Sequence, residues 1–298
     1  MDAIKTVNLT KSYGKVRGIR NLNLTVSEGD FFGFIGPNGA GKSTTIHTLL
    51  GLIRPTSGSA SILGMDIQKD REKILGCTGY LPSESSFYPG MWVKDILKLS
   101  ASLRKTDCTK NAKELCERLQ LDISRKAEEL SFGNRKKVGI VCALQHNPQL
   151  LILDEPTSGL DPLMQHEFFW ILQERHKEGA TIFLSSHVLS EIQHNCTRAA
   201  IIRDGEIIAS QDVEALSKNN AKRVMIEGNA DLSGLSGIRN LQKTNDTITF
   251  LYSGDINQLL HTLSTGNIKD LTLAEPDLEE IFLHYYKKGG QTHDSYKA

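Results

Sequence analysis

The sequence has no excess of charge of either sign, because 35 Lys and Arg residues are balanced by 35 Asp and Glu residues. Proteins that bind nucleic acid usually carry a basic stripe, and a formal net charge of zero gives no reason to expect one. Aromatic residues make up only 6% of the chain, so platforms on which single-stranded bases stack are not expected either. The composition therefore predicts no nucleic-acid partner.

Long hydrophobic runs and paired cysteines are also missing. No stretch approaches the roughly 18 consecutive apolar residues that a membrane-spanning helix needs, and the opening residues, MDAIKTVNLTKSYG, lack the apolar core of a secretory leader. The five cysteines are odd in number, and none belongs to a Cys-x-x-Cys pair. We therefore expect a soluble intracellular protein with reduced thiols.

Strand and helix patterns alternate along much of the chain. Strands are expected at 30–35, 150–153, 181–184 and 199–204, the last paired with 206–209 in a hairpin turned by Asp204-Gly205. Helices are expected at 44–50 and from the N-cap Asp161 and first-turn Pro162 to Gly179. This alternation predicts an α/β core with a largely parallel sheet.

Two segments depart from that pattern. Between 90 and 148 the strand signal disappears and apolar residues recur at helical spacing, which predicts a helical insertion. After about residue 220 short strands (223–227 and 247–252) and amphipathic helices (256–263 and 278–286) are expected. The predicted organisation is a core domain at 1–218 with a helical subdomain at about 84–148, a small α+β domain at 219–287, and a flexible tail at 288–298.

The sharpest motif is a glycine-rich loop between an expected strand and an expected helix. It reads Gly36-Pro37-Asn38-Gly39-Ala40-Gly41-Lys42-Ser43-Thr44 and fits the pattern G-x-x-x-x-G-K-[ST]. Glycines let backbone N–H groups converge on an anion, and the helix N-terminus adds partial positive charge. Lys42 can reach the β and γ phosphates, and the Ser43 hydroxyl can bind Mg²⁺. A chance match in a glycine-rich turn is the alternative, and the strand–loop–helix context disfavours it.

An acidic pair, Asp154-Glu155, ends the buried strand expected at 150–153. Carboxylates there are costly unless a cation or hydrogen bonds compensate them. Asp154 is therefore predicted on the Mg²⁺ side, directly or through water. Glu155 is predicted to polarise a water aimed at the γ-phosphate, as a general base. Two carboxylates that cap a turn before Pro156 are the structural alternative.

Together these motifs predict a nucleoside triphosphatase, and the absence of an Asn-Lys-x-Asp motif leaves GTP specificity unsupported. Further segments resemble the ATP-binding cassette (ABC) ATPases. Residues 130–137, LSFGNRKK, resemble the signature loop usually written LSGGQ. Residues 158–161 resemble the D-loop, 185–187 the switch-histidine segment, and Tyr13 matches the aromatic residue that stacks on adenine. The resemblance covers residues 4 to about 215.

This resemblance implies a P-loop NTPase fold of the ABC ATPase type, with an antiparallel β subdomain, a helical insertion and a small C-terminal α+β appendage. It implies a head-to-tail dimer in which ATP lies between Lys42, Ser43 and Asp154 of one chain and the signature loop of the other. His187 would hydrogen-bond the γ-phosphate and is placed with Glu155 as catalytic. The implied nucleotide-binding residues are Tyr13, Asn38, Gly39, Ala40, Gly41, Lys42, Ser43, Thr44, Ser131, Gly133 and Asn134.

Two departures from the family pattern affect these expectations. Phe132 stands at the first signature glycine and Asn134 at the glutamine, although Ser131 and Gly133 are retained. Ser83 stands where the family has the Q-loop glutamine, which completes a predicted metal set of Ser43, Asp154 and Ser83. We expect weaker positioning of Mg²⁺ and water there, and slow basal turnover that a partner stimulates.

The single cassette carries no membrane span, so a transporter would need a separate transmembrane permease subunit. The apolar segment 87–92 is expected to contact it, with buried packing as the alternative. The segment 275–282 resembles the ending of ABC-2 type exporter cassettes, and the LPSES and LSFGNRKK variants resemble Gram-positive exporters of peptides or drugs. The resemblance implies an ATP-hydrolysing subunit at the cytoplasmic face of the cell membrane that drives outward transport of a drug, antimicrobial peptide or toxin peptide.

Three other classes compete with the transporter. A translation cassette usually has two cassettes in tandem, and a chromosome-maintenance cassette has a long coiled coil that this sequence lacks. An ATP-gated regulatory switch with little hydrolysis fits the altered Ser83 and signature loops. Glu155 argues against the switch, because a protein that does not hydrolyse ATP needs no general base.

Overall fold

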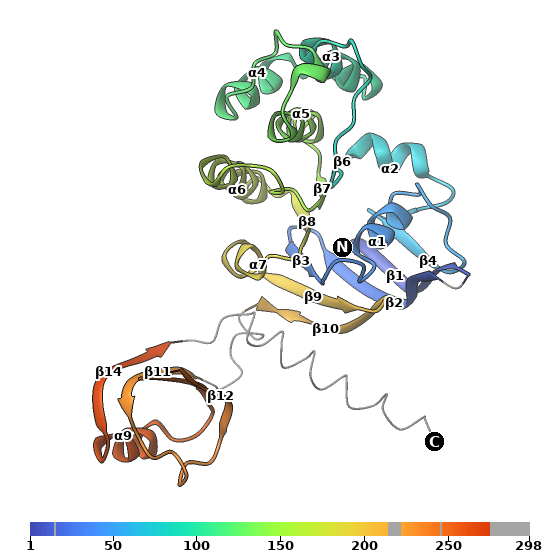
Figure 1. Ribbon diagram of the computed structural model, residues 1–298. Helices are drawn as coiled ribbons and strands as arrows, with labels where there is room; N and C mark the ends of the chain where they lie inside the picture. The colour runs from blue at the N-terminus through green and yellow to red at the C-terminus, as the bar shows by residue number, and fades with distance from the viewer. Residues whose placement is uncertain (15, 214–221, 245, 275–298) are drawn as a thin grey trace. The chain divides into compact units, whose positions relative to one another are not determined.

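The computed structural model describes residues 1–14, 16–213, 222–244 and 246–274 (Figure 1). The chain divides into two compact units, Met1–Gln211 and Asp212–Ala298. The domain boundary expected at 218, the helix expected at 278–286 and the tail expected at 288–298 lie outside the described residues.

A six-stranded sheet with the order β10-β9-β3-β8-β7-β6 forms the centre of the first unit. Its pairs from β9 through β3, β8 and β7 to β6 are parallel, as the alternation of strands and helices predicts. Asp204 and Gly205 both have positive φ angles, 51° and 82°, in the turn between β9 and β10. The predicted hairpin is confirmed. The strands are β3 (Phe31–Ile35), β6 (Thr78–Leu81), β7 (Leu150–Asp154), β8 (Thr181–Ser186), β9 (Arg198–Arg203) and β10 (Glu206–Asp212).

A second, antiparallel sheet has the order β2-β1-β4-β5, and helix α1 (Lys42–Leu49) packs with both sheets. Buried side chains of the two sheets and α1 form one hydrophobic cluster, including Ile4, Ile62, Phe34 and Ile46. Because α1 follows β3 directly, this core fixes the start of the helix against the end of the strand. The strands are β1 (Asp2–Tyr13), β2 (Val16–Ser27), β4 (Ser57–Ile62) and β5 (Met65–Asp66).

Helices replace strands between β6 and β7, as the sequence predicts. They are α3 (Val93–Leu103), α4 (Thr109–Arg118) and α5 (Phe132–Leu144), with the short 3-10 helix η1 (Ala127–Glu129) before α5; α2 (Arg71–Cys77) precedes β6. Figure 1 shows α3, α4 and α5 grouped at one end of the unit. Ser131 caps α5 by accepting a hydrogen bond from the Asn134 N–H at 3.3 Å. No helix in the described part of the chain is long and apolar enough to cross a membrane.

Helices α6 (Pro162–Lys177) and α7 (Leu189–Asn195) follow β7 and β8. The predicted start of α6 is confirmed, since the Asp161 carboxylate accepts from the Met164 N–H at 3.0 Å. The predicted stop is confirmed as well, because Gly179 takes a φ of 98° just past the helix.

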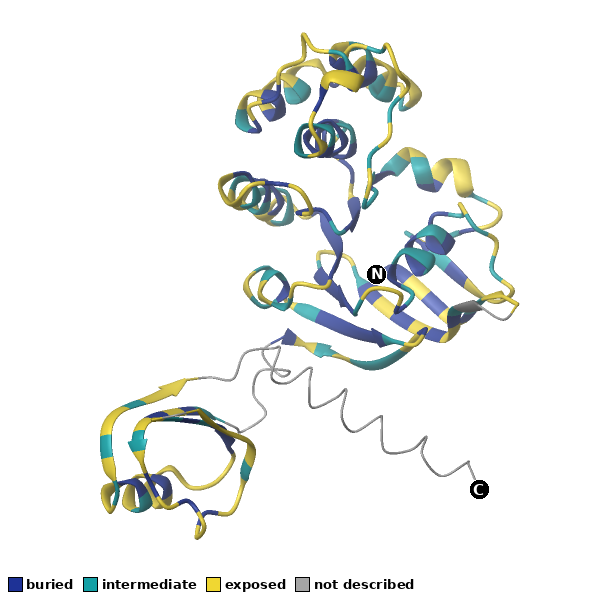
Figure 2. Cartoon of the chain, viewed as in Figure 1, coloured by how far each residue is buried: buried dark blue, intermediate teal, exposed yellow. Residues whose placement is uncertain are grey.

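The second unit is an antiparallel sheet of order β12-β13-β11-β14 with one helix, α9 (Ile256–Ser264). Its strands are β11 (Lys222–Asn229), β12 (Ile238–Thr244), β13 (Thr247–Tyr252) and β14 (Asn267–Ala274). The sequence predicts β11, β13 and α9 and misses β12 and β14. The missed strands are mostly exposed on both faces (Figure 2), so they lack the alternation of buried and exposed residues that signals a strand.

Candidate nucleotide site

The glycine-rich loop lies where the sequence places it, between β3 and α1. All five residues of β3 are buried, and a Cβ atom on Gly36 would lie 2.6 Å from the Ile202 carbonyl oxygen. Gly41 has a φ of 110° immediately before α1, a conformation that favours glycine. Sterics at both ends of the loop thus require the glycines of the motif.

Lys42 projects into this loop with its side chain only 6% exposed. Its ammonium donates to the carbonyl oxygens of Gly36 at 2.6 Å and Pro37 at 3.2 Å. It also forms an ion pair with Glu155 Oε1, at an N–O distance of 3.1 Å. The loop therefore holds its positive charge at the start of α1, where the helix dipole favours an anion.

The remaining loop residues surround that charge. Ser43 and Thr44 are half-buried in the first turn of α1, and Ala40 is buried behind the loop. Asn38 and Gly39 are exposed. The loop thus presents an open side to a ligand.

Asp154 lies at the end of β7 and is completely buried. The parallel register pairs it with Ser185 on β8, whose hydroxyl donates to Asp154 Oδ1 at 2.5 Å. Asp154 Oδ2 is buried and accepts no hydrogen bond within the described structure. A buried carboxylate oxygen without a partner is costly, so this atom is where a cation would be most stabilising.

Glu155 is held from both its backbone and its carboxylate. Its φ is 48°, which is uncommon for a residue with a side chain. Its N–H lies 3.2 Å from both the carbonyl and the hydroxyl oxygen of Ser185. Oε1 pairs with Lys42, and Oε2 lies 2.5 Å from Nδ1 of His187. Strained backbone conformations persist where surrounding contacts enforce them and often occur at functional sites.

His187 is thus brought to Glu155, as the sequence suggests for two members of one site. Its side chain remains 51% exposed. The segment before it is anchored by Glu191 on α7, which accepts from the Ser186 hydroxyl at 2.7 Å and from the Thr157 hydroxyl at 2.6 Å. One carboxylate therefore ties the loop after β7 to the loop after β8.

The signature residues lie against the D-loop-like segment of their own chain. A Cβ atom on Gly133 would lie 2.6 Å from the Gly159 carbonyl oxygen, and the Phe132 ring covers the Cα of Gly159. Ser131 and Phe132 are exposed, whereas Asn134 is half-buried. The signature-like and D-loop-like segments of this chain therefore pack against each other.

Tyr13 lies at the end of β1 with its side chain 43% exposed. The Lys11 ammonium lies 5.1 Å from the centre of its ring, a cation–π contact. The neighbouring strand β2 reaches the phosphate loop, because Ile19 Cγ2 lies 3.0 Å from where a Gly41 Cβ would be. Tyr13 thus lies on the strand that pairs with β2, and its ring is partly exposed.

Ser83 is half-buried in the loop after β6, which is the strand next to β7. Its carbonyl oxygen accepts from the Lys136 ammonium, which also reaches the Glu155 carbonyl, each at 2.9 Å. The structure thus brings the Ser83 loop to the acidic pair.

Three residues around the site have no individual role assigned from the sequence: Lys136, Ser185 and Glu191. Ser185 and Glu191 carry a signal, since Ser185 is a polar residue at the end of an apolar strand and Glu191 follows His187 by four residues. Lys136 carries none, because a lysine in a helix ordinarily indicates a solvated face.

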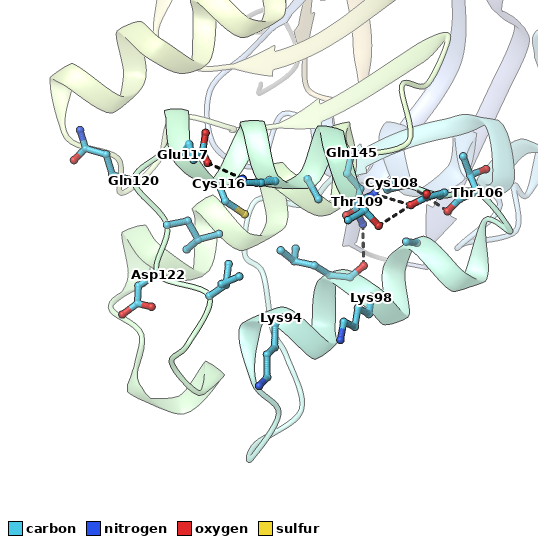
Figure 3. A pocket seen from close by; sticks show the side chains of 17 residues that line it. Lys94, Lys98, Thr106, Cys108, Thr109, Cys116, Glu117, Gln120, Asp122 and Gln145 are labelled. Carbon is cyan, nitrogen blue, oxygen red and sulfur yellow. Dashed lines mark hydrogen bonds and ion pairs between the residues drawn. The ribbon is translucent and has the colours of Figure 1, made fainter.

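A separate hollow lies elsewhere, between α3 and α4 (Figure 3). It measures about 800 Å³ and is lined mostly by apolar atoms, with Lys94, Lys98 and Asp122 at its rim. None of the residues of the phosphate loop or the acidic pair contributes to it. The convergence of charged groups, rather than cavity size, therefore identifies the candidate site.

Comparison with known proteins agrees with this geometry. A family model described as ABC transporter matches residues 19–158. The bacitracin transport ATP-binding protein BcrA of Bacillus licheniformis is 35% identical, over 94% of this chain and 96% of that protein. The chain belongs to the ABC transporter ATP-binding proteins. The linearmycin resistance ATP-binding protein LnrL of Bacillus subtilis is 31% identical, over 94% of this chain and 97% of that protein.

Solved structures of this ABC family show the same fold. One described as the ATP-binding subunit of an ABC transporter is 29% identical, with a TM-score of 0.69 over 72% of this chain and 92% of that chain. A nucleotide-free ATP-binding cassette is 27% identical, with a TM-score of 0.61 over 71% of this chain and 92% of that chain. The predicted ABC ATPase fold and the prediction of an ATP-binding, ATP-hydrolysing subunit are confirmed.

Proposed function

We propose that this ABC ATPase drives an exporter that moves a drug, antimicrobial peptide or toxin peptide outward through a separate permease subunit. The observation that carries its hydrolytic part is the convergence of Lys42, Glu155 and His187 beside the buried, unpartnered oxygen of Asp154. The cargo class is supported by relatives named for bacitracin transport and linearmycin resistance, which align over 94% of this chain.

ATP binding begins with an exchange of partners at Lys42. The β and γ phosphate oxygens replace Glu155 at the ammonium, while backbone N–H groups of the loop from Asn38 to Thr44 bind the remaining charge. The ring of Tyr13 stacks on adenine. The exchange frees the carboxylate of Glu155 at the moment the γ-phosphate arrives.

Hydrolysis then uses the freed carboxylate. Glu155 accepts a proton from a water molecule as the water oxygen forms a bond to the γ-phosphorus. The bond between that phosphorus and the bridging oxygen breaks, and ADP leaves with the electron pair. His187, already beside Glu155, donates a hydrogen bond to the γ-phosphate and keeps the attacking geometry.

A magnesium ion fits the residues present. The unpartnered Asp154 Oδ2 and the Ser43 hydroxyl supply oxygen donors of the kind Mg²⁺ prefers, and Ser83 adds a second hydroxyl. Within the described residues no three His, Cys, Asp or Glu side chains gather as a metal site, so Mg²⁺ would depend on phosphate and water oxygens as well. When bound, it neutralises charge on the β and γ phosphates.

A second copy, or a related cassette, completes the site in a head-to-tail dimer. The exposed N-terminus of α5 supports this, because Ser131 caps the helix and nearby N–H groups offer an anion site. Ser131, Gly133 and Asn134 would contact the nucleotide bound to the other chain. ATP then joins the two subunits, and release of phosphate loosens them.

The permease would hold the ATPase at the cytoplasmic face of the membrane. Its expected contact is the apolar segment 87–92, in which Tyr88 is 76% exposed and Trp92 40% exposed. Large exposed apolar side chains in one loop are typical of a protein contact.

Co-purification with the membrane protein encoded next to this chain tests the transporter assignment. We expect a complex whose ATP hydrolysis rises with bacitracin-like peptide and falls to background on Tyr88→Asp/Trp92→Asp substitution, with basal hydrolysis of the isolated subunit retained. If the ATPase purifies without the membrane subunit and its hydrolysis does not respond to peptide, the transporter assignment is contradicted.

An ATP-gated switch is the second candidate, because Ser83 lacks the amide of the family's Q-loop glutamine. Phosphate release from the purified protein separates the two. Equal rates in the wild type and in Glu155→Gln would favour the switch.

A further inference from the structure

Lys136 is a buried charged residue that the mechanism above does not use. It lies in the second turn of α5 with its side chain only 1% exposed. Its ammonium donates three hydrogen bonds, to the carbonyl oxygens of Pro82 at 3.0 Å, Ser83 at 2.9 Å and Glu155 at 2.9 Å. A lysine ammonium has three N–H donors, so these three carbonyls use its full capacity.

The burial of this charge is energetically unfavourable. It lowers the pKa of Lys136 to about 8, although the nearby Asp154, Glu155 and Glu84 carboxylates act in the opposite direction. A buried charge of this kind is weak evidence for a contribution to stability. A role in fixing geometry accounts for it better, since the three carbonyls come from two separate loops.

The carbonyl at Glu155 is the informative partner. Glu155 has a φ of 48°, and a left-handed conformation is unfavourable for a residue with a side chain. Its N–H is fixed by Ser185 on β8, and its carbonyl by Lys136 on α5. The Ser158 N–H also points to that carbonyl, at the longer distance of 3.3 Å. Without Lys136, the carbonyl of Glu155 loses the shorter of its two hydrogen bonds.

We propose that Lys136 is a positioning residue for ATP hydrolysis, which holds the backbone of Glu155 so that its carboxylate faces the γ-phosphate. The same ammonium joins Glu155 to the Ser83 loop. It also joins both to α5, whose N-cap Ser131 lies five residues, or about 7.5 Å of helix, away. When the N-terminus of α5 binds nucleotide and α5 shifts, Lys136 transmits that shift to the backbone of Glu155.

This inference rests on the proposed role of Glu155 as general base, and it makes a distinct kinetic prediction. Lys136→Met keeps an unbranched side chain that is one atom shorter, and it removes all three donors. We expect kcat to fall about 10- to 100-fold, because small displacements of a reacting group are costly. The equilibrium Kd for ATP should stay within about twofold of the wild-type value. The ammonium of Lys136 donates to backbone carbonyls, whereas Lys42 binds the phosphates.

Two companion variants sharpen the test. Lys136→Gln retains amide donors and should recover part of the lost kcat, and it also serves if the methionine variant does not fold. Lys113→Met removes an exposed lysine of α4, outside every segment assigned to nucleotide, and should leave kcat near the wild-type value. Nucleotide binding by each purified variant reports that it is folded.

A double-mutant comparison with Glu155→Gln separates this inference from the proposed function. If Lys136 acts through Glu155, the double variant Lys136→Met/Glu155→Gln hydrolyses ATP as slowly as Glu155→Gln alone. Three outcomes would overturn the role of Lys136. They are a further, multiplicative loss of rate in the double variant, an unchanged kcat in Lys136→Met, and a rise in its Kd for ATP as large as the fall in kcat. An unchanged rate in Glu155→Gln itself would instead overturn the general base.

Discussion

Lys42 has two competing partners in the proposed mechanism, the Glu155 carboxylate and the phosphates of ATP. Its side chain is only 6% exposed, and its ammonium already donates to two loop carbonyls. The positive charge is therefore held in place for an anion. Lys42→Ala should weaken ATP affinity by roughly 100-fold, since charged hydrogen bonds contribute about 1.5–3 kcal/mol each. Titration with a fluorescent ATP analogue measures it, and full affinity in this variant would show that the phosphates bind elsewhere.

His146, at the end of α5, gives the fold a pH dependence. Burial, followed by the positive charge of Arg104, lowers the pKa of His146 from 6.5 to about 4. The Arg104 Nε–H donates to His146 Nε2 at 3.0 Å, a bond that only a ring with a free Nε2 lone pair accepts. Between about pH 6.5 and 4 the unfolded chain binds more protons than the folded one, so the free energy of unfolding falls as pH falls.

Urea denaturation across that pH range tests this dependence. His146→Gln keeps an acceptor for Arg104 and does not titrate, so its unfolding free energy should change less steeply from pH 6.5 to 4 than that of the wild type. Parallel slopes for the two proteins would exclude His146 as the source.

Among the elements, α6 provides a direct test of the sequence-based boundaries. Its N-cap, Asp161, accepts from the Met164 N–H, and loss of such a cap typically costs about 1 kcal/mol. Asp161→Ala should lower the unfolding free energy by that amount in the absence of nucleotide. Asp161→Asn, which keeps an acceptor oxygen, should lose only a few tenths. Equal losses in both would show that the cap does not stabilise α6.

Elements with a single strong local signal were predictable from the sequence. Strand β7 is apolar on both faces, and α6 has Asp161, Pro162 and Gly179 at its ends. Strand β12 was not predictable, because six of its seven residues are exposed and it forms through pairing with β13. A strand that forms through such nonlocal pairing need not show an alternation of apolar and polar residues in the sequence.

The candidate site shows the same division between local and nonlocal information. The loop 36–44 and the pair Asp154-Glu155 could be predicted because each motif is local and its chemistry needs those residue types. The contacts of Lys136 could not, because they depend on α5 packing against the ends of β6 and β7. The positive φ of Glu155 is likewise a product of tertiary contacts, since nothing in its neighbours requires it.

In the whole molecule, the two units have different relations to the proposed function. All residues assigned to nucleotide lie in Met1–Gln211, and the sheet of β11 to β14 lies in the second unit. Both units contribute to the region that aligns with BcrA, since the alignment spans 94% of the chain. The first unit therefore carries the chemistry of an ABC ATPase, and dimer formation is expected to depend on the nucleotide bound there.

Phosphate release by the purified subunit with ATP and Mg²⁺, measured beside ATP binding in the same preparations, is the decisive test of Glu155 as the general base. We expect Glu155→Gln to release phosphate at least about 100-fold more slowly than the wild type. We also expect this variant to bind ATP more tightly, because the carboxylate that competes for Lys42 is gone. Wild-type hydrolysis in Glu155→Gln, or slower hydrolysis explained wholly by lost ATP binding, would contradict that role.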